Sequence, residues 1–409
     1  MLKKYRKWIV YSTGISILLS IAIFVMNKQV QHEAIEYDKR HPIHMTTLQN
    51  GEVEIISEGK ELYSSLINDI HKARERVYMQ FFIIRYDEQT KRLLKALEEA
   101  ALRGVEVKVT GDLMGSREMS LAPLSTLKEK GVVFKWSRPL HSSSIFHSIQ
   151  HRNHRRIVAI DQSISYIGGF NVGNEYIGKD KKLGHWTDTH VRLVGNNIEM
   201  AQQFKMDWEE DRGETKWKDS KVKSVSFESN KETSYQFLFT TGAELEQKMV
   251  SWIKGAKEDI WIATPYFMPS DALAAEMLQA AKRGVNIKVM VPKTSDAWFT
   301  QPPGYHRMEK LMNKNITWLE YTKGFLHSKI MIIDHDFVDV GTANWDPRSL
   351  YLNDESNCLL YGQEINQRFR EVYLNNEQFA TRITEQDLTE KPWWVKVLGK
   401  TPKDIQYYF

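Results

Sequence analysis

Two distant segments of the chain place a histidine, a cation and an aspartate at the same intervals. Each cation lies two residues after its histidine, and each aspartate lies seven residues after it. The two sets are His154, Arg156, Asp161 and His327, Lys329, Asp334. In a strand, residues two apart share a face, so each imidazole would lie beside its cation. Both ionisation states of an imidazole are accessible near neutral pH, so the pattern predicts nucleophilic or acid–base chemistry.

A glycine-containing turn and an asparagine follow each of these segments. The residues are Gly168, Gly169 and Asn171 in one copy and Gly341, Thr342 and Asn344 in the other. Glycine allows a ligand to approach the backbone closely, and an asparagine amide donates hydrogen bonds without adding charge. We therefore predict that Gly169, Asn171, Thr342 and Asn344 bind substrate. An imidazole, a cation and an amide at one point suit a phosphoryl group, and two copies supply a nucleophile and an acid without a metal.

A histidine-rich stretch before the first motif admits a metal-site interpretation. His147, His151 and His154 are spaced as on one helical face. The neighbouring arginines disfavour a bound cation, and the single cysteine, Cys358, excludes a cysteine-rich zinc site. We predict no metal and no cofactor, and we place His141, His147 and His151 in a surface loop whose surroundings line an entrance for lipid headgroups.

The elements around the motifs occur twice and in the same order. AALRGVEVKVTGD (100–112) corresponds to AAKRGVNIKVMVP (280–292), and ARERVYMQFFI (73–83) to AKEDIWIATPYF (256–267). Each half is predicted to contain a helix, a strand, a second helix, another strand and the histidine-bearing strand. This indicates an α/β fold with two similar lobes in a pseudo-twofold arrangement, spanning 45–215 and 216–409. The polar stretch 212–234 is the predicted linker.

The N-terminus predicts a membrane anchor. Residues 8–26 carry no charge and are numerous enough to cross a bilayer as a helix. A cleaved signal peptide is the alternative, but no small-residue cleavage site follows, so residues 1–30 are taken as an uncleaved anchor. The four cations before the span place the N-terminus in the cytoplasm and the bulk of the chain on the outer side of the membrane.

The C-terminal sequence KPWWVKVLGKTPKDIQYYF alternates aromatic residues with lysines. Such a mixture suits a membrane interface, while packing of Trp393 and Trp394 in the core is the alternative.

The paired motifs resemble those of the phospholipase D superfamily, and the longer segments RNHRRIVAID, IGGFNVGNEY, WTDTHVRLVG, TPYFMP and VGTANWDPRSLYLNDESN resemble its bacterial cardiolipin synthase branch. The resemblance covers roughly residues 45–375. It implies phosphatidyl transfer between two phosphatidylglycerol molecules, with His154 as nucleophile and His327 as acid and then base, although the near-symmetry allows these roles to be exchanged. It further implies that Asp188 and Glu355 orient the imidazoles. Asp161 and Asp334 follow buried strands, so we expect them to brace the motifs.

One residue departs from the family pattern, because Arg156 stands where the second motif has lysine. Arginine stays charged but is bulkier, so the substitution is not neutral at a tight site. Alternative functions are hydrolysis of phospholipid, cleavage of nucleic acid, and an inactive lipid-binding scaffold. The formal charge of only +4 disfavours a nucleic-acid partner, and the intact second motif disfavours the scaffold.

Overall fold

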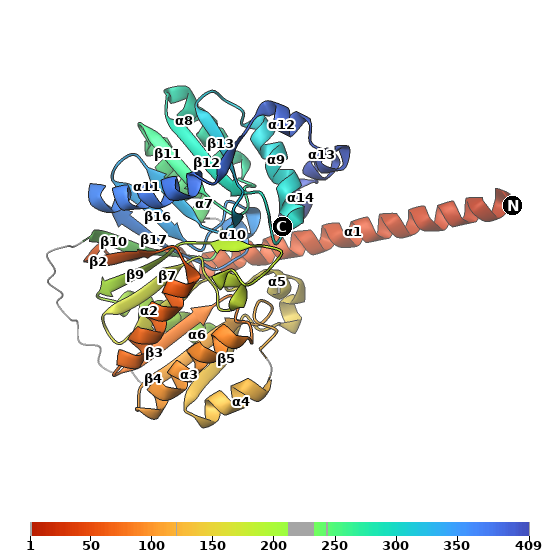
Figure 1. The fold of residues 1–409 in the computed structure, drawn as a ribbon. Coiled ribbons are helices and arrows are strands. Elements are labelled where there is room, and N and C mark those ends of the chain that lie inside the picture. Colours follow the sequence, from red (N-terminus) through yellow and green to blue (C-terminus); the bar gives the residue numbers. More distant parts are fainter. Residues whose placement is uncertain (1, 120, 212–232, 243, 409) are drawn as a thin grey trace.

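A computed structural model describes residues 2–119, 121–211, 233–242 and 244–408. The chain forms a two-lobed α/β body from which one long helix, α1 (Leu2–Arg40), projects (Figure 1). Part of α1 is long and apolar enough to cross a membrane. The predicted linker, 212–234, and the boundary between 215 and 216 lie almost wholly outside the described residues.

The first lobe contains the elements up to residue 210. Its strands are β1 (His44–Met45), β2 (Gln49–Ile56), β3 (Arg76–Phe81), β4 (Glu106–Asp112), β5 (Val132–Ser137), β6 (Ile157–Ile160), β7 (Ile164–Gly168), β8 (His185–Thr187) and β9 (His190–Gly195). Its helices are α2 (Gly59–Lys72), α3 (Glu88–Leu102), α4 (Leu121–Glu129), α5 (Ile145–Gln150) and α6 (Ile198–Glu210), with the 3-10 turns η1 (Ser142–Ser144) and η2 (Asn174–Ile177).

The second lobe repeats this order. Its strands are β10 (Thr233–Thr240), β11 (Asp259–Ala263), β12 (Asn286–Pro292), β13 (Ile316–Tyr321), β14 (Gly324–Leu326), β15 (Ile330–Ile333), β16 (Phe337–Gly341), β17 (Glu355–Tyr361) and β18 (Ala380–Ile383). Its helices are α7 (Glu244–Gly255), α8 (Asp271–Arg283), α9 (Gln301–Lys310), α10 (Pro347–Tyr351), α11 (Gln363–Glu377), α12 (Glu385–Thr389), α13 (Trp393–Gly399) and α14 (Lys403–Gln406), with the 3-10 turn η3 (Trp298–Thr300).

One 16-stranded sheet runs through both lobes. Its order is β18-β13-β12-β11-β15-β16-β17-β10-β2-β9-β7-β6-β3-β4-β5, with β1 paired to β10. From the β10–β2 junction outward, each half continues through corresponding strands, so β17 matches β9 and β15 matches β6. The junction is antiparallel and pairs Thr233 with Gly51. This mirrored order confirms the predicted two-lobe α/β fold.

Three large hydrophobic cores fill the described part of the body. One contains apolar residues of α2 and α3, and another those of α7 and α8. The third includes residues of α6 and α11 and strand residues from both lobes, among them Tyr78, Val191, Val338 and Leu360. Because this core is shared, the two lobes are packed as one unit.

Local sequence explains where the repeated helices begin and end. The Asp87 side chain caps α3 by accepting from Thr90 N at 3.1 Å, and Ser270 caps α8 by accepting from Leu273 N at 3.1 Å. Gly284 ends α8 in a left-handed conformation, φ 100°. These helices run antiparallel to their strands and bring the loops that follow the strands to one end of each lobe.

The structure corrects one detail of the predicted motifs. The strands β6 and β15 begin after the histidine–cation pairs, so His154 and His327 lie on extended segments leading into the strands. The sequence also did not predict the small sheet in which β8 of the first lobe pairs in parallel with β14 of the second.

Candidate active site

A cavity of about 340 Å³ lies between the lobes. Its lining brings together His154 and His327 with three further predicted residues, Arg156, Asn171 and Asn344. Phe82 and Trp186 form part of its wall, with ring centroids 4.9 Å from His154 and 5.0 Å from His327, respectively. The two motifs therefore share a single partly apolar cavity.

His154 is held by partners on both ring nitrogens. Nδ1 lies 2.8 Å from Oε2 and 2.9 Å from Oε1 of Glu355, which is fully buried. Nε2 lies 2.9 Å from Nη2 of Arg156. Because a guanidinium only donates, Nε2 is the acceptor and Nδ1 carries the proton donated to Glu355. This tautomer leaves the Nε2 lone pair directed toward the cation and the cavity.

His327 has a related but unequal environment. Its Nδ1 lies 2.6 Å from Oδ2 of the buried Asp188 and 2.8 Å from Nζ of Lys329. The Lys329 ammonium also donates to the backbone oxygen of His327, at 2.5 Å. Lys329 lies behind the ring instead of lining the cavity, so Arg156 is the motif cation that faces the open space.

Each histidine takes its carboxylate from the opposite lobe. Glu355 and His154 are 201 residues apart, and Asp188 and His327 are 139 apart. Backbone bonds repeat the exchange, since His154 N donates to Asp354 O at 3.0 Å and His327 N donates to Thr187 O at 2.7 Å. The active arrangement consequently exists only where both lobes meet.

Burial controls the charges in the cavity. Burial, reinforced by Arg156 and Lys329, lowers the pKa of His154 well below its ordinary value, and the pKa of His327 is lowered by burial and the same cations. Burial also lowers the pKa of Lys329 to about 7 and raises that of Glu355 to about 7. The lowered pKa values favour the neutral form of both imidazoles in the free protein, and an entering phosphate would favour their protonated forms.

Arg156 is positioned by the asparagine of its own motif. Its Nε donates to Asn171 Oδ1 at 3.0 Å, and its Nη1 donates to the backbone oxygen of His154 at 2.7 Å. Asn344 differs, because its Oδ1 is buried and has no hydrogen-bond partner among the described residues. That oxygen is an acceptor available to a ligand hydroxyl.

Gly169 and Thr342 do not line the cavity, and their binding of substrate stays a prediction. A Cβ at Gly169 would lie 2.1 Å from Asp188 Oδ1, so glycine makes room for that carboxylate. Thr342 is fully buried and its hydroxyl donates to Glu355 Oε2 at 2.5 Å. Both positions therefore adjoin the carboxylates.

Asp161 and Asp334 lie away from the cavity, at left-handed turn positions with φ 49°. Asp161 accepts from three successive backbone N–H groups at residues 74–76, over 2.8–3.1 Å. Asp334 accepts in the same way from residues 257–259, over 2.8–3.2 Å. The geometry is that of a brace between turns, which is the role expected for both residues from the sequence.

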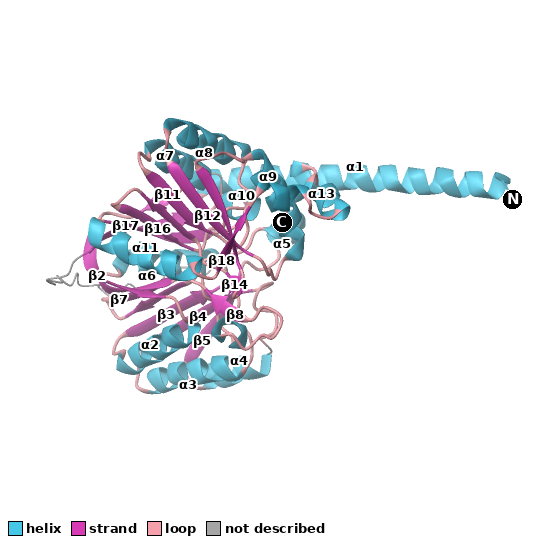
Figure 2. Cartoon of the chain, turned by 45° about the horizontal axis from the view of Figure 1, so that its top comes forward, coloured by secondary structure: helices cyan, strands magenta, loops and turns pink. Residues whose placement is uncertain are grey.

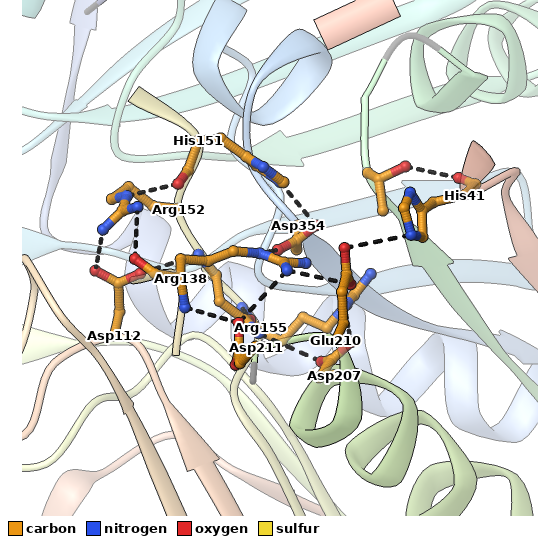
Figure 3. Close-up of polar contacts among 12 residues, drawn as sticks. His41, Asp112, Arg138, His151, Arg152, Arg155, Asp207, Glu210, Asp211 and Asp354 are labelled. Carbon is orange, nitrogen blue, oxygen red and sulfur yellow. Dashed lines mark hydrogen bonds and ion pairs between the residues drawn. The ribbon is translucent and has the colours of Figure 1, made fainter. Parts of the chain in front are cut away.

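The segment around His154 is anchored by a buried charge network (Figure 3). Arg155 donates to Asp207 at 2.5 Å, and Nε2 of His151 lies 3.0 Å from Asp354. His147 and His151 are buried, and both lie at or beside α5, which corrects their expected place in a surface loop. The basic appearance of HRNHRR thus reflects internal ion pairing, with partners far away in the sequence.

Sequence reasoning missed several cavity residues, among them Tyr266, Asp296 and Arg348. Tyr266 donates to Asp296 at 2.5 Å, and both line the cavity. Arg348 also lines it and donates to the backbone oxygen of Gln150 at 2.7 Å. The segments TPYFMP and DPRSL contained Tyr266 and Arg348, but only their position opposite the histidines identifies them as site residues.

A family model described as "Cardiolipin synthase, PLD-like domain" matches residues 66–208 and 249–376. The chain is 33% identical over 360 residues to cardiolipin synthase 2 of Staphylococcus epidermidis, covering 85% of this chain and 72% of that protein. It is 32% identical over 354 residues to the cardiolipin synthase of Listeria welshimeri, with 85% and 73% covered.

Among solved structures, phosphatidylserine synthase of Haemophilus influenzae aligns with a TM-score of 0.68 at 14% identity, covering 89% of this chain and 98% of that one. Polyphosphate kinase of Porphyromonas gingivalis aligns with a TM-score of 0.53 at 13% identity, covering 78% and 49%. At these identities the two alignments show the fold alone. From the family match and the sequence identities, the chain belongs to the phospholipase D-like cardiolipin synthase family and is an enzyme of the phosphatidyltransferase type.

Proposed function

We propose that the enzyme makes cardiolipin and glycerol from two molecules of phosphatidylglycerol through a phosphohistidine. The observation that carries the proposal is the pair of buried imidazoles in one cavity, each bound to a carboxylate of the opposite lobe. The names of the relatives supply the substrate class.

In the first step, Nε2 of His154 attacks the phosphorus of phosphatidylglycerol. The bond from phosphorus to the terminal glycerol oxygen breaks, and His327, protonated once the phosphate is bound, gives its proton to that oxygen. Arg156 stabilises the phosphate oxygens, because its guanidinium lies 2.9 Å from the attacking nitrogen. Glycerol leaves and a phosphatidyl group remains on His154.

In the second step, the free hydroxyl of another phosphatidylglycerol loses its proton to His327 and attacks phosphorus. The phosphorus–nitrogen bond breaks, which releases cardiolipin and restores His154. The unpartnered Oδ1 of Asn344 supports a hydroxylated acceptor, since it can accept a hydrogen bond from a second glycerol hydroxyl. We assign His154 as the nucleophile because its Nε2 carries the lone pair directed toward the motif cation and the cavity. In the second motif the cation, Lys329, lies against Nδ1 of His327 instead.

The test is to supply the purified full-length chain with phosphatidylglycerol labelled in its acyl chains or, in a parallel sample, in its headgroup glycerol, and to resolve the products. Cardiolipin and glycerol in equal amounts are expected. Phosphatidic acid and glycerol without cardiolipin would make water the acceptor and the enzyme a hydrolase. His154→Ala and His327→Ala should each reduce turnover by at least about 10³-fold, and only the chain with an intact His154 should retain label from the phosphatidyl moiety after acid-free denaturation.

A further inference from the structure

Apolar side chains are concentrated on the side of the body from which α1 leaves. Eleven exposed large apolar residues lie in three short stretches outside α1 and together are called the apolar collar here: Leu140, Ile145, Phe146, Ile149, Trp298, Phe299, Trp393, Trp394, Val397, Leu398 and Ile405. Trp393 is 76% exposed and Val397 61%. Soluble surfaces seldom gather such residues without a partner.

The stretches of the collar are joined by contacts around the base of α1. Val30 and Ala34 of α1 form a small core with Leu352, against which Tyr407 and Tyr408 of the C-terminal segment pack. The Arg348 guanidinium then links this segment to α5, because it donates to the backbone oxygens of Tyr408, at 3.3 Å, and Gln150, at 2.7 Å.

The remaining stretch, η3, joins the collar through α9. Gly399, at the end of α13, lies so close to Pro302 that an added Cβ would be 2.9 Å from its backbone oxygen. Pro302 is in the first turn of α9, directly after η3. Both overall views show α5, α13 and the C-terminus on the side from which α1 projects (Figures 1 and 2). The collar is therefore one surface around the base of α1.

The partner of this surface follows from what α1 itself exposes. Ile15, Leu18 and Phe24 are 57–67% exposed, on a helix long and apolar enough to cross a bilayer. A bilayer around that segment would lie over the collar. Lys396 and Lys400 are exposed between the collar's tryptophan and aliphatic side chains, and this mixture of aromatic and cationic groups suits the headgroup layer of anionic lipids.

We propose that the apolar collar docks the catalytic body on the surface of the anionic bilayer crossed by α1, with the collar side chains inserted at the headgroup level. Phe299 and Tyr408 belong to the lining of the catalytic cavity, so the docked cavity would adjoin the headgroup layer. Docking also accounts for the exposure of Trp393 and Trp394. Because both side chains are exposed, they are not packed in the core. The inference rests on α1 as an anchor, and only its effect on turnover rests on the proposed function.

The direct test uses the full chain in nanodiscs containing phosphatidylglycerol. Cys358 is buried, so Val397→Cys, Phe146→Cys and, as control, Leu102→Cys can each be labelled with an environment-sensitive fluorophore. Leu102 is 67% exposed but lies at the end of α3, away from the collar. Spin-labelled lipids should quench the probes at 397 and 146 at least about threefold more than the probe at 102. Equal quenching at all three positions would overturn docking, whatever the enzymatic activity.

A second test separates docking from catalysis. The double variant Trp393→Gln/Val397→Gln should lose at least about tenfold in turnover in proteoliposomes but stay within about twofold of wild type in mixed detergent micelles, where no flat surface exists. Leu102→Gln should match wild type in both. Unchanged turnover in proteoliposomes, or equal loss in both preparations, would overturn the role of the collar. Absence of cardiolipin from the wild-type enzyme would refute the proposed function and leave the quenching result standing.

Discussion

Replacement of Glu355 by glutamine should remove most activity and at the same time stabilise the fold at alkaline pH. Glu355 accepts the Nδ1 proton of His154 through both oxygens, at 2.8 and 2.9 Å, within a fully buried setting. A glutamine amide donates to Nδ1 and shifts the ring proton to Nε2, where the nucleophilic lone pair is required. The loss of an orienting carboxylate of this kind reduces kcat about 10⁴-fold in a serine protease, so we expect a reduction of about 10³- to 10⁴-fold.

The stability effect follows from the buried charge of Glu355. Burial raises its pKa from 4.5 to about 7, and each pKa unit corresponds to about 1.4 kcal/mol. A carboxyl with a raised pKa favours the folded state below its unfolded pKa and loses that contribution as pH rises through the folded value. The difference in unfolding free energy between Glu355→Gln and wild type should therefore grow by about 3 kcal/mol in favour of the variant as pH rises from 4.5 to 8.

Asp339 provides a matched control, because burial also raises its pKa to about 7 while its partner is Asn357, outside the cavity. Asp339→Asn should show the same sign of pH-dependent stabilisation with kcat within about twofold of wild type. The measurements are cardiolipin formation in mixed micelles and denaturant unfolding at several pH values. A loss of activity below about tenfold in Glu355→Gln would refute its orienting role, and a stability difference that does not grow with pH would refute the buried-charge argument.

Three further predictions concern the cations and the brace. Plots of kcat/KM against pH should be bell-shaped with a maximum near 7. Activity falls on the acid side because Glu355 takes up a proton as pH falls through about 7, and on the alkaline side because Lys329 loses its charge as pH rises through about 7. A flat profile from pH 5 to 9 would contradict this. Arg156→Lys should lower kcat about tenfold, since lysine cannot keep the bonds to Asn171 and His154 together, and a faster variant would instead identify the arginine as partial decay. Asp334→Ala should lower the unfolding free energy by about 2 kcal/mol with kcat within about threefold of wild type at a temperature where it is folded, and a large loss of kcat in the folded variant would assign it a catalytic role.

The repeated features of the fold could be predicted from sequence because they depend on local patterns. Segments 100–112 and 280–292 share apolar spacing and a glycine, and each contains the end of a helix followed by a strand, α3 with β4 and α8 with β12. The interval between histidine and aspartate is set by a four-residue buried strand plus its turn, which is why it recurs. The mirrored strand order follows from duplication of such a unit.

Other features could not be predicted because they join residues that no local pattern relates. The spacing of Asp188 and Glu355 from the histidines differs between the halves, and nothing in it indicates that each serves the opposite lobe. Arg155 likewise reads as a solvated cation until its bond to Asp207 is seen. The positions of Gly169 and Thr342 beside the carboxylates could not be predicted for the same reason, because a turn next to the motif can face either the cavity or the carboxylate behind it.

Each histidine contacts a carboxylate of the opposite lobe, and this exchange explains why the two motifs differ at the cation position while both histidines remain oriented. If each lobe oriented its own histidine, either lobe could decay independently. Here a change at Glu355 alters His154, and a change at Asp188 alters His327, so neither lobe can lose its acid without disabling the other. The motif cations are not exchanged in this way, since each contacts the histidine of its own lobe. The cation position is thus where the halves can diverge, with Arg156 facing the cavity and Lys329 set behind its imidazole.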